Sequence, residues 1–247
     1  MKVKDITGYL EDLYPPILQE DYDNCGLITG NLDQDVTGVL LCLDITRGVM
    51  DEARENGCNM IVSHHPMVFR GLKKINGSDP VQQLVIRSVR ENLAIFAVHT
   101  SIDNALEGLN KYMGEKFGLQ NIRILQPRSK FLQKLVTYVP ENKASEIRQA
   151  LFAAGAGHIG NYDQCSYNLA GEGTFRANEL ANPYVGEKNE LHFEKETRIE
   201  VVMPGYLRNK IINALVDIHP YEEVAYDVYS LENEFSAAGS GIIGDLE

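Results

Sequence analysis

The sequence predicts an α/β protein with a partly parallel sheet and flanking helices, followed by a ferredoxin-like α+β domain. Two observations carry this prediction. In the first half, apolar runs of strand length alternate with helical segments, which is typical of βαβ units. In the second half, the core of the expected element order is β-α-β-β-α-β, which is that of a ferredoxin-like unit. Because the pattern changes near Pro127, we expect domains at residues 1–127 and 128–247.

The first half contains apolar runs that are continuous rather than alternating, as expected for strands buried on both faces. These runs are Gly38–Leu43, Asn59–Ser63 and Ala94–Val98. Helical patterns separate them, and their ends carry capping residues such as Asp79 with Pro80 at a start and Gly57 or Gly118 after an end. The expected helices are Asp5–Leu13, Arg47–Asn56, Asp79–Asn92 and Glu107–Phe117.

The second half reads as strands paired around two helices. The expected strands are Lys134–Val139, Asp163–Ala170, Gly173–Arg176, Thr197–Met203 and Val224–Leu231. The expected helices are Lys143–Ala154 and Tyr206–Val216. Gly171-Glu172 is interpreted as the turn that joins the second and third of these strands.

Composition limits the classes of function. The chain has 247 residues and a formal net charge of -12, with no cluster of five or more lysines and arginines to offset it. An acidic chain is repelled by phosphate backbones, so nucleic acid is not an expected partner. No apolar run approaches the ~20 residues of a membrane span. The start of the chain has no signal-peptide pattern, and the four cysteines show no C-x-x-C spacing, so a reduced, cytoplasmic setting is expected.

Three polar residues follow strands in a way that suggests a metal site. His64 and His65 come directly after the strand ending at Ser63, and Asp103 follows the strand ending at Val98. Ligands of open α/β sheets bind just beyond the carboxyl ends of strands. Imidazole and carboxylate groups bind divalent transition metals. Adjacent histidines in extended backbone point in opposite directions, so they suit a pair of ions better than one ion, and Asp103 could bridge that pair.

The residue types also allow plainer interpretations. A histidine at a strand end is often only hydrogen-bonded, so spacing alone leaves a metal site and a structural role open. Asp44 follows the strand Gly38–Leu43 and could support a histidine ligand, although a helix cap is the simpler role. Gly155-Ala156-Gly157 lacks the rest of a dinucleotide-binding fingerprint and is interpreted as a loop.

Several runs resemble the Nif-three-like family, whose members are often described as GTP cyclohydrolase I type 2 homologues. In the first domain, the runs are Asp23-Asn24-Cys25-Gly26-Leu27, Ser63-His64-His65-Pro66 and His99-Thr100-Ser101-Ile102-Asp103-Asn104-Ala105. In the second domain, which resembles the inserted module of the longer bacterial members, they are Gly157–Tyr162, Gly171–Phe175, Asn182–Gly186 and His219–Glu223. The resemblance covers nearly the whole chain.

The resemblance implies a dinuclear metal centre on His64, His65 and Asp103, with two divalent ions per subunit. The metal could be Zn, Fe, Mn or Ni. It implies hydrolytic opening of a guanine nucleotide ring, a nucleotide substrate and a toroidal homohexamer. His99 could act as a proton carrier in catalysis or support a ligand, because imidazole titrates near neutral pH; a purely structural role is open as well.

One departure from the family pattern affects these expectations. Long members continue into a second core half that adds a histidine and a glutamate spaced His-x-x-x-Glu, and this sequence ends at Glu247, where that half would begin. His219 and Glu223 have the same spacing, but they lie in a run of the inserted module and are not assigned to the metal site. We therefore expect weak metal occupancy and little activity from this chain alone. A non-enzymatic, metal-dependent regulatory or ligand-binding module is the alternative function.

Overall fold

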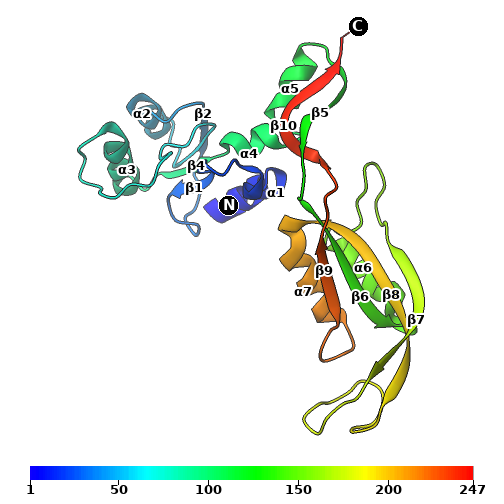
Figure 1. Ribbon diagram of the computed structural model, residues 1–247. Helices are drawn as coiled ribbons and strands as arrows, with labels where there is room; N and C mark the ends of the chain where they lie inside the picture. The colour runs from blue at the N-terminus through cyan, green and yellow to red at the C-terminus, as the bar shows by residue number, and fades with distance from the viewer. Residues whose placement is uncertain (247) are drawn as a thin grey trace. The chain divides into compact units, whose positions relative to one another are not determined.

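The computed structural model describes residues 1–246 and divides the chain into two compact units (Figure 1). The first unit comprises Met1–Pro127 together with the residues from Ser236 onward, and the second unit is Arg128–Phe235. The second unit is therefore inserted into the first. This differs from the expected module of residues 128–247 at its C-terminal end, and Glu247 itself lies outside the described residues.

The first unit is built on a four-stranded sheet with the order β1-β4-β3-β2. The strands are β1 (Gly26–Thr29), β2 (Val39–Cys42), β3 (Met60–Ser63) and β4 (Ala94–Ala97). The helices of this unit are α1 (Val3–Leu13), α2 (Arg47–Glu55), α3 (Pro80–Arg90), α4 (His99–Asn104) and α5 (Leu109–Lys116). Strands β2, β3 and β4 run parallel, and β1 is antiparallel to β4. The partly parallel sheet with flanking helices is thus present as the sequence predicts.

Apolar side chains pack on both faces of this sheet. On one face, Ile61 and Ile95 contact a cluster that includes Met50 of α2. On the other face, Met60 and Phe96 pack with Val3 of α1. Burial on both faces explains why β3 and β4 read as continuous apolar runs.

Strand β2 departs from the prediction of burial on both faces. Within residues 1–246 it pairs only with β3, so it forms an edge of the sheet. Leu41 is 76% exposed and Leu43, just after the strand, is 59% exposed. An apolar run of this length predicts a strand but does not say whether other parts of the same chain cover both of its faces.

Two long strands of the first unit were not predicted. Strands β5 (Gln120–Arg128) and β10 (Phe235–Asp245) pair with each other and lie side by side in Figure 1. Close to this pair, the backbone amide of Leu106 donates to the carbonyl of Ala237, which ties the segment after α4 to β10. The pairing brings together the segments on either side of the insertion, so it returns the polypeptide to the first unit.

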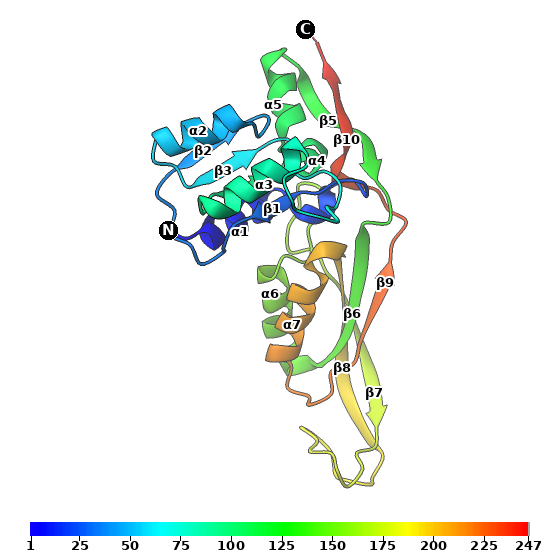
Figure 2. The ribbon, with the colours of Figure 1, turned by 90° about the vertical axis from the view of Figure 1, so that its left-hand side faces the viewer.

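The second unit has the ferredoxin-like arrangement that the element order predicts. Its sheet has the order β7-β8-β6-β9 with antiparallel neighbours, and α6 and α7 lie together on one face (Figure 2). The strands are β6 (Leu132–Pro140), β7 (Tyr167–Phe175), β8 (His192–Pro204) and β9 (Tyr226–Ser230), and the helices are α6 (Ala144–Ala153) and α7 (Arg208–Ile218). Leu135, Ile147, Ile199, Ile211 and Leu215 form a fully buried core between helices and sheet.

The turn expected at Gly171-Glu172 is wrong. Strand β7 runs straight through these residues, with Gly171 opposite Glu196 and Gly173 opposite Glu194 on β8. The chain turns only after Phe175, through a long loop that leads to β8 at His192. A Gly-Glu-Gly run suggests a turn in isolation, but here the pairing with β8 continues through it, and the Glu196 carboxylate lies next to Gly173.

Two further observations concern the described residues as a group. No helix within residues 1–246 combines the length and apolar character needed to cross a membrane. Cys25, Cys42, Cys58 and Cys165 are all free thiols.

Candidate metal centre

Three histidines meet at one end of the parallel strands of the first unit. His64 and His65 follow β3 directly, and His99 begins α4, which comes after β4. The backbone ladder continues past the strands: the amide of His64 donates to the carbonyl of Cys42, and the amide of His99 donates to the carbonyl of His64. Because parallel strands end at the same edge of the sheet, this ladder places the histidines beside one another.

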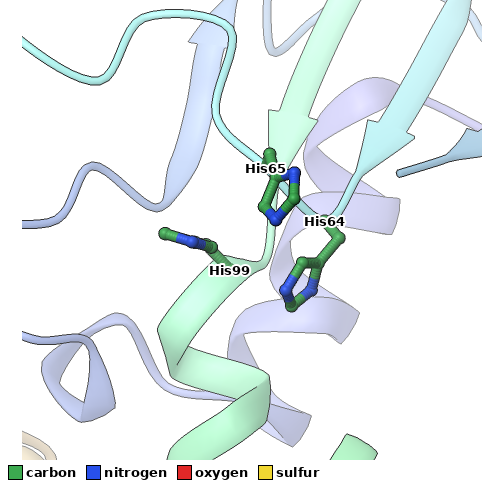
Figure 3. Close-up of side chains that lie close together, drawn as sticks. All are labelled: His64, His65 and His99. Atoms are coloured by element: carbon green, nitrogen blue, oxygen red, sulfur yellow. The ribbon is translucent and has the colours of Figure 1, made fainter. Parts of the chain in front are cut away.

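The imidazole rings face a common space (Figure 3). One nitrogen from each of His64, His65 and His99 lies within 4.8 Å of the others. The ring centroids of His64 and His65 are 4.9 Å apart, and each is 5.4 Å from that of His99. Asp103, on α4, adds a carboxylate whose Oδ2 is 3.7 Å from Nε2 of His64.

His99 has an unusual backbone conformation. Its φ is +25°, in a region that residues with a side chain rarely adopt. Such conformations persist where the surrounding structure holds them, and they gather at functional sites. Here the conformation occurs at the change from β4 to α4, and it accompanies the placement of the His99 ring beside those of His64 and His65.

Two aspartates form hydrogen bonds with two of the imidazole rings. Nδ1 of His65 is 2.7 Å from Oδ1 of Asp44, and Nδ1 of His99 is 2.7 Å from Oδ1 of Asp23. A carboxylate can only accept, so each Nδ1 carries the proton and donates it. The other ring nitrogen, Nε2, then keeps its lone pair. This carboxylate–histidine arrangement is the one that supports histidine ligands in metal sites.

Asp23 is the most strongly held of these groups. Its side chain is fully buried, and burial alone would raise its pKa. Hydrogen bonds from the Thr100 hydroxyl, the His99 ring and the backbone amide of Asn24 outweigh burial and hold the pKa of Asp23 well below its usual range. Asp23 therefore stays an acceptor at any moderate pH, which fixes the tautomer of His99.

The run Asp23-Asn24-Cys25 makes several contacts close to the histidines. The Cys25 thiol is 3.2 Å from Oδ2 of Asp23 and 3.3 Å from the carbonyl of Val98. Burial raises the pKa of the Cys25 thiol to about 11, so it stays protonated and can donate to these oxygens. The side-chain amide of Asn24 (Nδ2) donates to the carbonyl of Val68, which fixes the loop that follows the histidine pair. The Asp-Asn-Cys run thus positions groups around the histidines.

Burial also sets the charge of His64 and Asp103. It lowers the pKa of His64; Asp103 opposes this effect, and His65 and His99 add to it. Burial raises the pKa of Asp103, while His64 and His99 oppose it. At neutral pH, His64 is therefore a neutral imidazole, which is the form that binds a metal ion.

These residues fit a divalent metal. The donor set is three imidazole nitrogens and one carboxylate, which are ligand types for Zn, Mn, Fe and Ni. The His64 side chain is 19% exposed and the His99 side chain 18%, whereas that of His65 is 44% exposed, so the site is open on one side. Among residues 1–246, no other set of three potential ligand atoms lies this close together.

Several sequence predictions concern this site. The structure brings His64, His65 and Asp103 to one place as expected, with Asp103 on α4. His99, expected as a proton carrier, a supporting residue or a structural residue, lies close enough to His64 and His65 to be a further candidate ligand. Asp44 contacts His65, and the cap of α2 is Thr46, so the helix-cap interpretation of Asp44 is wrong.

His219 and Glu223 do not belong to this cluster. His219 is buried in the second unit, where Nε2 is 3.1 Å from the carbonyl of Tyr138 and Nδ1 accepts from the amide of Tyr221. Both ring nitrogens therefore have partners within that unit. His219 is the residue that ends α7, and neither it nor Glu223 is part of the histidine cluster.

Sequence comparisons relate the chain to a known family. Residues 1–247 match the Duf34/NIF3 (NGG1p interacting factor 3) family over their whole length. A Halalkalibacterium halodurans protein named GTP cyclohydrolase 1 type 2 homolog is 40% identical over 233 residues, covering 94% of this chain and 63% of that protein. A Bacillus subtilis protein of the same name is 36% identical over 245 residues, covering 99% of this chain and 66% of that protein. The chain thus spans somewhat less than two thirds of the length of these relatives.

A solved structure supports the same relation. The crystal structure of a Bacillus cereus protein related to NIF3 matches with a TM-score of 0.84 and 40% sequence identity. The match covers 99% of this chain and 65% of the Bacillus cereus chain. Both units of the fold are therefore shared with this relative.

Proposed function

Because the chain belongs to the Duf34/NIF3 family, we propose that it forms the ligand-bearing part of a metal-dependent hydrolase acting on the ring of a guanine nucleotide. The observation that carries the proposal is the set of three imidazoles that converge within 4.8 Å, two of them held by buried or adjoining aspartates. The substrate class comes from the name of the relatives, GTP cyclohydrolase 1 type 2 homolog.

In this proposal, His64, His65, His99 and Asp103 hold divalent ions. Ions held there would supply Lewis acidity and would lower the pKa of a water molecule. Asp23 and Asp44 keep the Nδ1 protons of His99 and His65 in place, so that both Nε2 atoms offer lone pairs without rearrangement. The preformed orientation reduces the cost of assembling the site.

The surface beside the histidines suits a nucleotide. The exposed ring of Phe69 lies edge-on to His99 at 6.2 Å, and Tyr22 lies 6.2 Å from Phe69. These rings offer an aromatic surface for a planar base. The same loop continues with Arg70, Lys73 and Lys74, which are all exposed. In a chain with a net charge of -12, this local positive charge would favour the phosphates of a nucleotide.

The proposal is tested on the chain joined to the second core half that the family resemblance implies. We expect metal-dependent turnover of GTP that His64→Ala reduces by at least about 100-fold, because a metal ligand is lost. His158→Ala is the matched control, since His158 is exposed in the second unit and far in sequence from the cluster. Turnover that survives His64→Ala, or that needs no divalent metal, would refute the proposal.

A second candidate function is a metal-dependent ligand-binding protein without turnover. The observation that favours it is a cavity of about 590 Å³ in the second unit, which lies within the size range of small-molecule sites. This function predicts metal binding at the histidines and ligand binding at the cavity, with no consumption of GTP. The turnover assay on the extended chain separates it from the first function.

As a partner, we propose a second copy of the chain, because the family resemblance implies a toroidal hexamer. The exposed Leu41 and Leu43 at the β2 edge support self-association, since they leave apolar surface open at an unpaired strand. Light scattering on the purified chain tests this. If the wild-type chain is already a monomer, so that Leu41→Asp leaves its mass unchanged, this would count against an interface at β2.

A further inference from the structure

A cavity in the second unit lies away from the histidine cluster and has its own chemistry. Three runs that carry the resemblance of this unit to the inserted module line the cavity together. They are Gly171–Phe175 on β7, Pro183 and Tyr184 in the loop after β7, and Tyr221–Glu223 after α7. Segments that are far apart in the sequence thus converge on one space, and the metal site makes no use of any of them.

Aromatic rings form much of the cavity wall. Phe175 and Tyr184 lie 6.4 Å and 6.1 Å from Tyr221, with their planes tilted by about 50° to its ring. Tyr138 of β6 also lines the space. The rings therefore surround the cavity from the sheet, the loop and the segment before β9. Faces of tyrosine and phenylalanine rings attract positive charge.

The charged groups of the cavity are mainly acidic. Glu172, Glu196, Glu222 and Glu223 line it, with Arg198 as the one cation among the described lining residues. Arg198 donates to Glu200 at 2.9 Å, and Glu200 is shared with Lys134, so Arg198 can offset at most one of the four lining carboxylates. The surplus negative charge beside aromatic faces favours a cationic ligand.

Glu196 is held in a defined position. The Tyr221 hydroxyl donates to Oε1 of Glu196 at 2.9 Å, and burial together with this carboxylate raises the pKa of Tyr221, which keeps the hydroxyl protonated. Gly173 leaves the space in which Oε2 lies, since a Cβ there would be 2.2 Å away. Glu222 accepts from the backbone amide of Asn182, which holds the loop that carries Tyr184.

We propose that this cavity binds an organic cation, namely an amine or quaternary ammonium group on an apolar body. The volume of about 590 Å³ suits a small organic molecule rather than a bare ion. The carboxylates are also too dispersed for a metal: within residues 1–246, three potential ligand atoms gather closely only at the first-unit histidines. The site is independent of the proposed hydrolase function.

A series of probes that differ only in charge tests the proposal. Binding of 2-phenylethylamine, 2-phenylethanol and phenylacetate to the wild-type chain is measured by calorimetry and by amide chemical shifts. We expect the amine to bind about tenfold more tightly than the alcohol, with phenylacetate weakest. The shifts should map to β7, β8 and the segment around Tyr221. Equal affinities for amine and alcohol, preference for phenylacetate, or no binding of the amine would overturn the proposal.

Variants then locate the charge. Glu196→Gln keeps an acceptor for Tyr221 and should weaken the amine about tenfold while leaving the alcohol unchanged. Glu187→Gln makes the same change in charge on the loop between β7 and β8, outside the cavity lining, and should alter neither. Tyr184→Ala should weaken both probes, and it serves if Glu196→Gln does not fold. An equal loss in Glu196→Gln and Glu187→Gln would contradict the proposal, and unchanged metal binding in these variants separates the two sites.

Discussion

Two aspartates that contact Nδ1 of a ring orient two of the candidate ligands. Asp44 contacts His65 and Asp23 contacts His99, each at 2.7 Å. Without these contacts, the rings could rotate and either nitrogen could carry the proton. The affinity for metal should therefore depend on residues that are not ligands themselves.

Asp44→Asn tests this dependence. Asparagine keeps the size of the side chain but weakens the hydrogen bond to Nδ1 of His65 because the charge is lost. We expect the affinity for Zn²⁺ to fall by about 10- to 100-fold with the fold unchanged. Asp35→Asn, at an exposed surface ion pair with Lys2, is the control and should have no effect. Equal affinities in the two variants would show that Asp44 does not support the site.

Part of this arrangement follows from sequence alone. His64 and His65 directly follow a strongly apolar strand, so their place at the carboxyl edge is predictable. The partners of the rings are not, because Asp23 is 76 residues from His99 and Asp44 is 21 residues from His65. The conformation of His99 at φ +25° also has no sequence signal. His99 could have been recognised as a ligand only by the same strand-end position that marks the histidine pair.

At the level of elements, strands with strong apolar character were predictable and strands defined by their partner were not. Strand β10 has the sequence FSAAGSGIIGD, whose small residues give no clear alternation, and its partner β5 begins more than a hundred residues earlier. Strand β7 contains two glycines that suggest a turn, yet its pairing with β8 continues through them. Long-range pairing decides both cases.

The core of the second unit gives a prediction for its stability. Ile199 of β8 is fully buried among residues that all belong to this unit. We expect Ile199→Ala to lower the free energy of unfolding of the isolated Arg128–Phe235 fragment by about 2–5 kcal/mol. Val216 of α7 is 48% exposed, so Val216→Ala should lower the free energy of unfolding much less. Thermal melts by circular dichroism measure both; a fragment without a cooperative transition would show that the unit does not fold alone.

At the level of the whole molecule, the insertion changes what a cleavage experiment should show. The second unit connects to the first at both ends, near Pro127 and near Ser236. After a single cut near residue 128, the second unit would still be connected to the first unit through β10. The predicted change of pattern near Pro127 lies at the first of these connections, while the second escaped prediction because β10 has a weak pattern.

The number of ligands gives a prediction for activity. The described residues gather three imidazoles and one carboxylate, which is few for two ions, since a single catalytic zinc commonly takes three protein ligands. The His65 side chain is also partly exposed to solvent, and contact with water weakens electrostatic stabilisation of a reaction. We expect little or no GTP turnover from the 247-residue chain by itself. Robust metal-dependent turnover by this chain, abolished by His64→Ala, would contradict this.

Binding of Zn²⁺ to the purified chain, followed by calorimetry and elemental analysis, tests the central claim most directly. We expect a measurable but incomplete occupancy of the wild-type chain. In each of His64→Ala, His65→Ala and His99→Ala, the affinity for Zn²⁺ should fall by at least about 100-fold, because every ring contributes one nitrogen to the cluster. His158→Ala, which removes an exposed histidine of the second unit, should bind as the wild type does. Zinc binding that is unchanged in all three cluster variants would contradict the claim that these histidines form a metal centre.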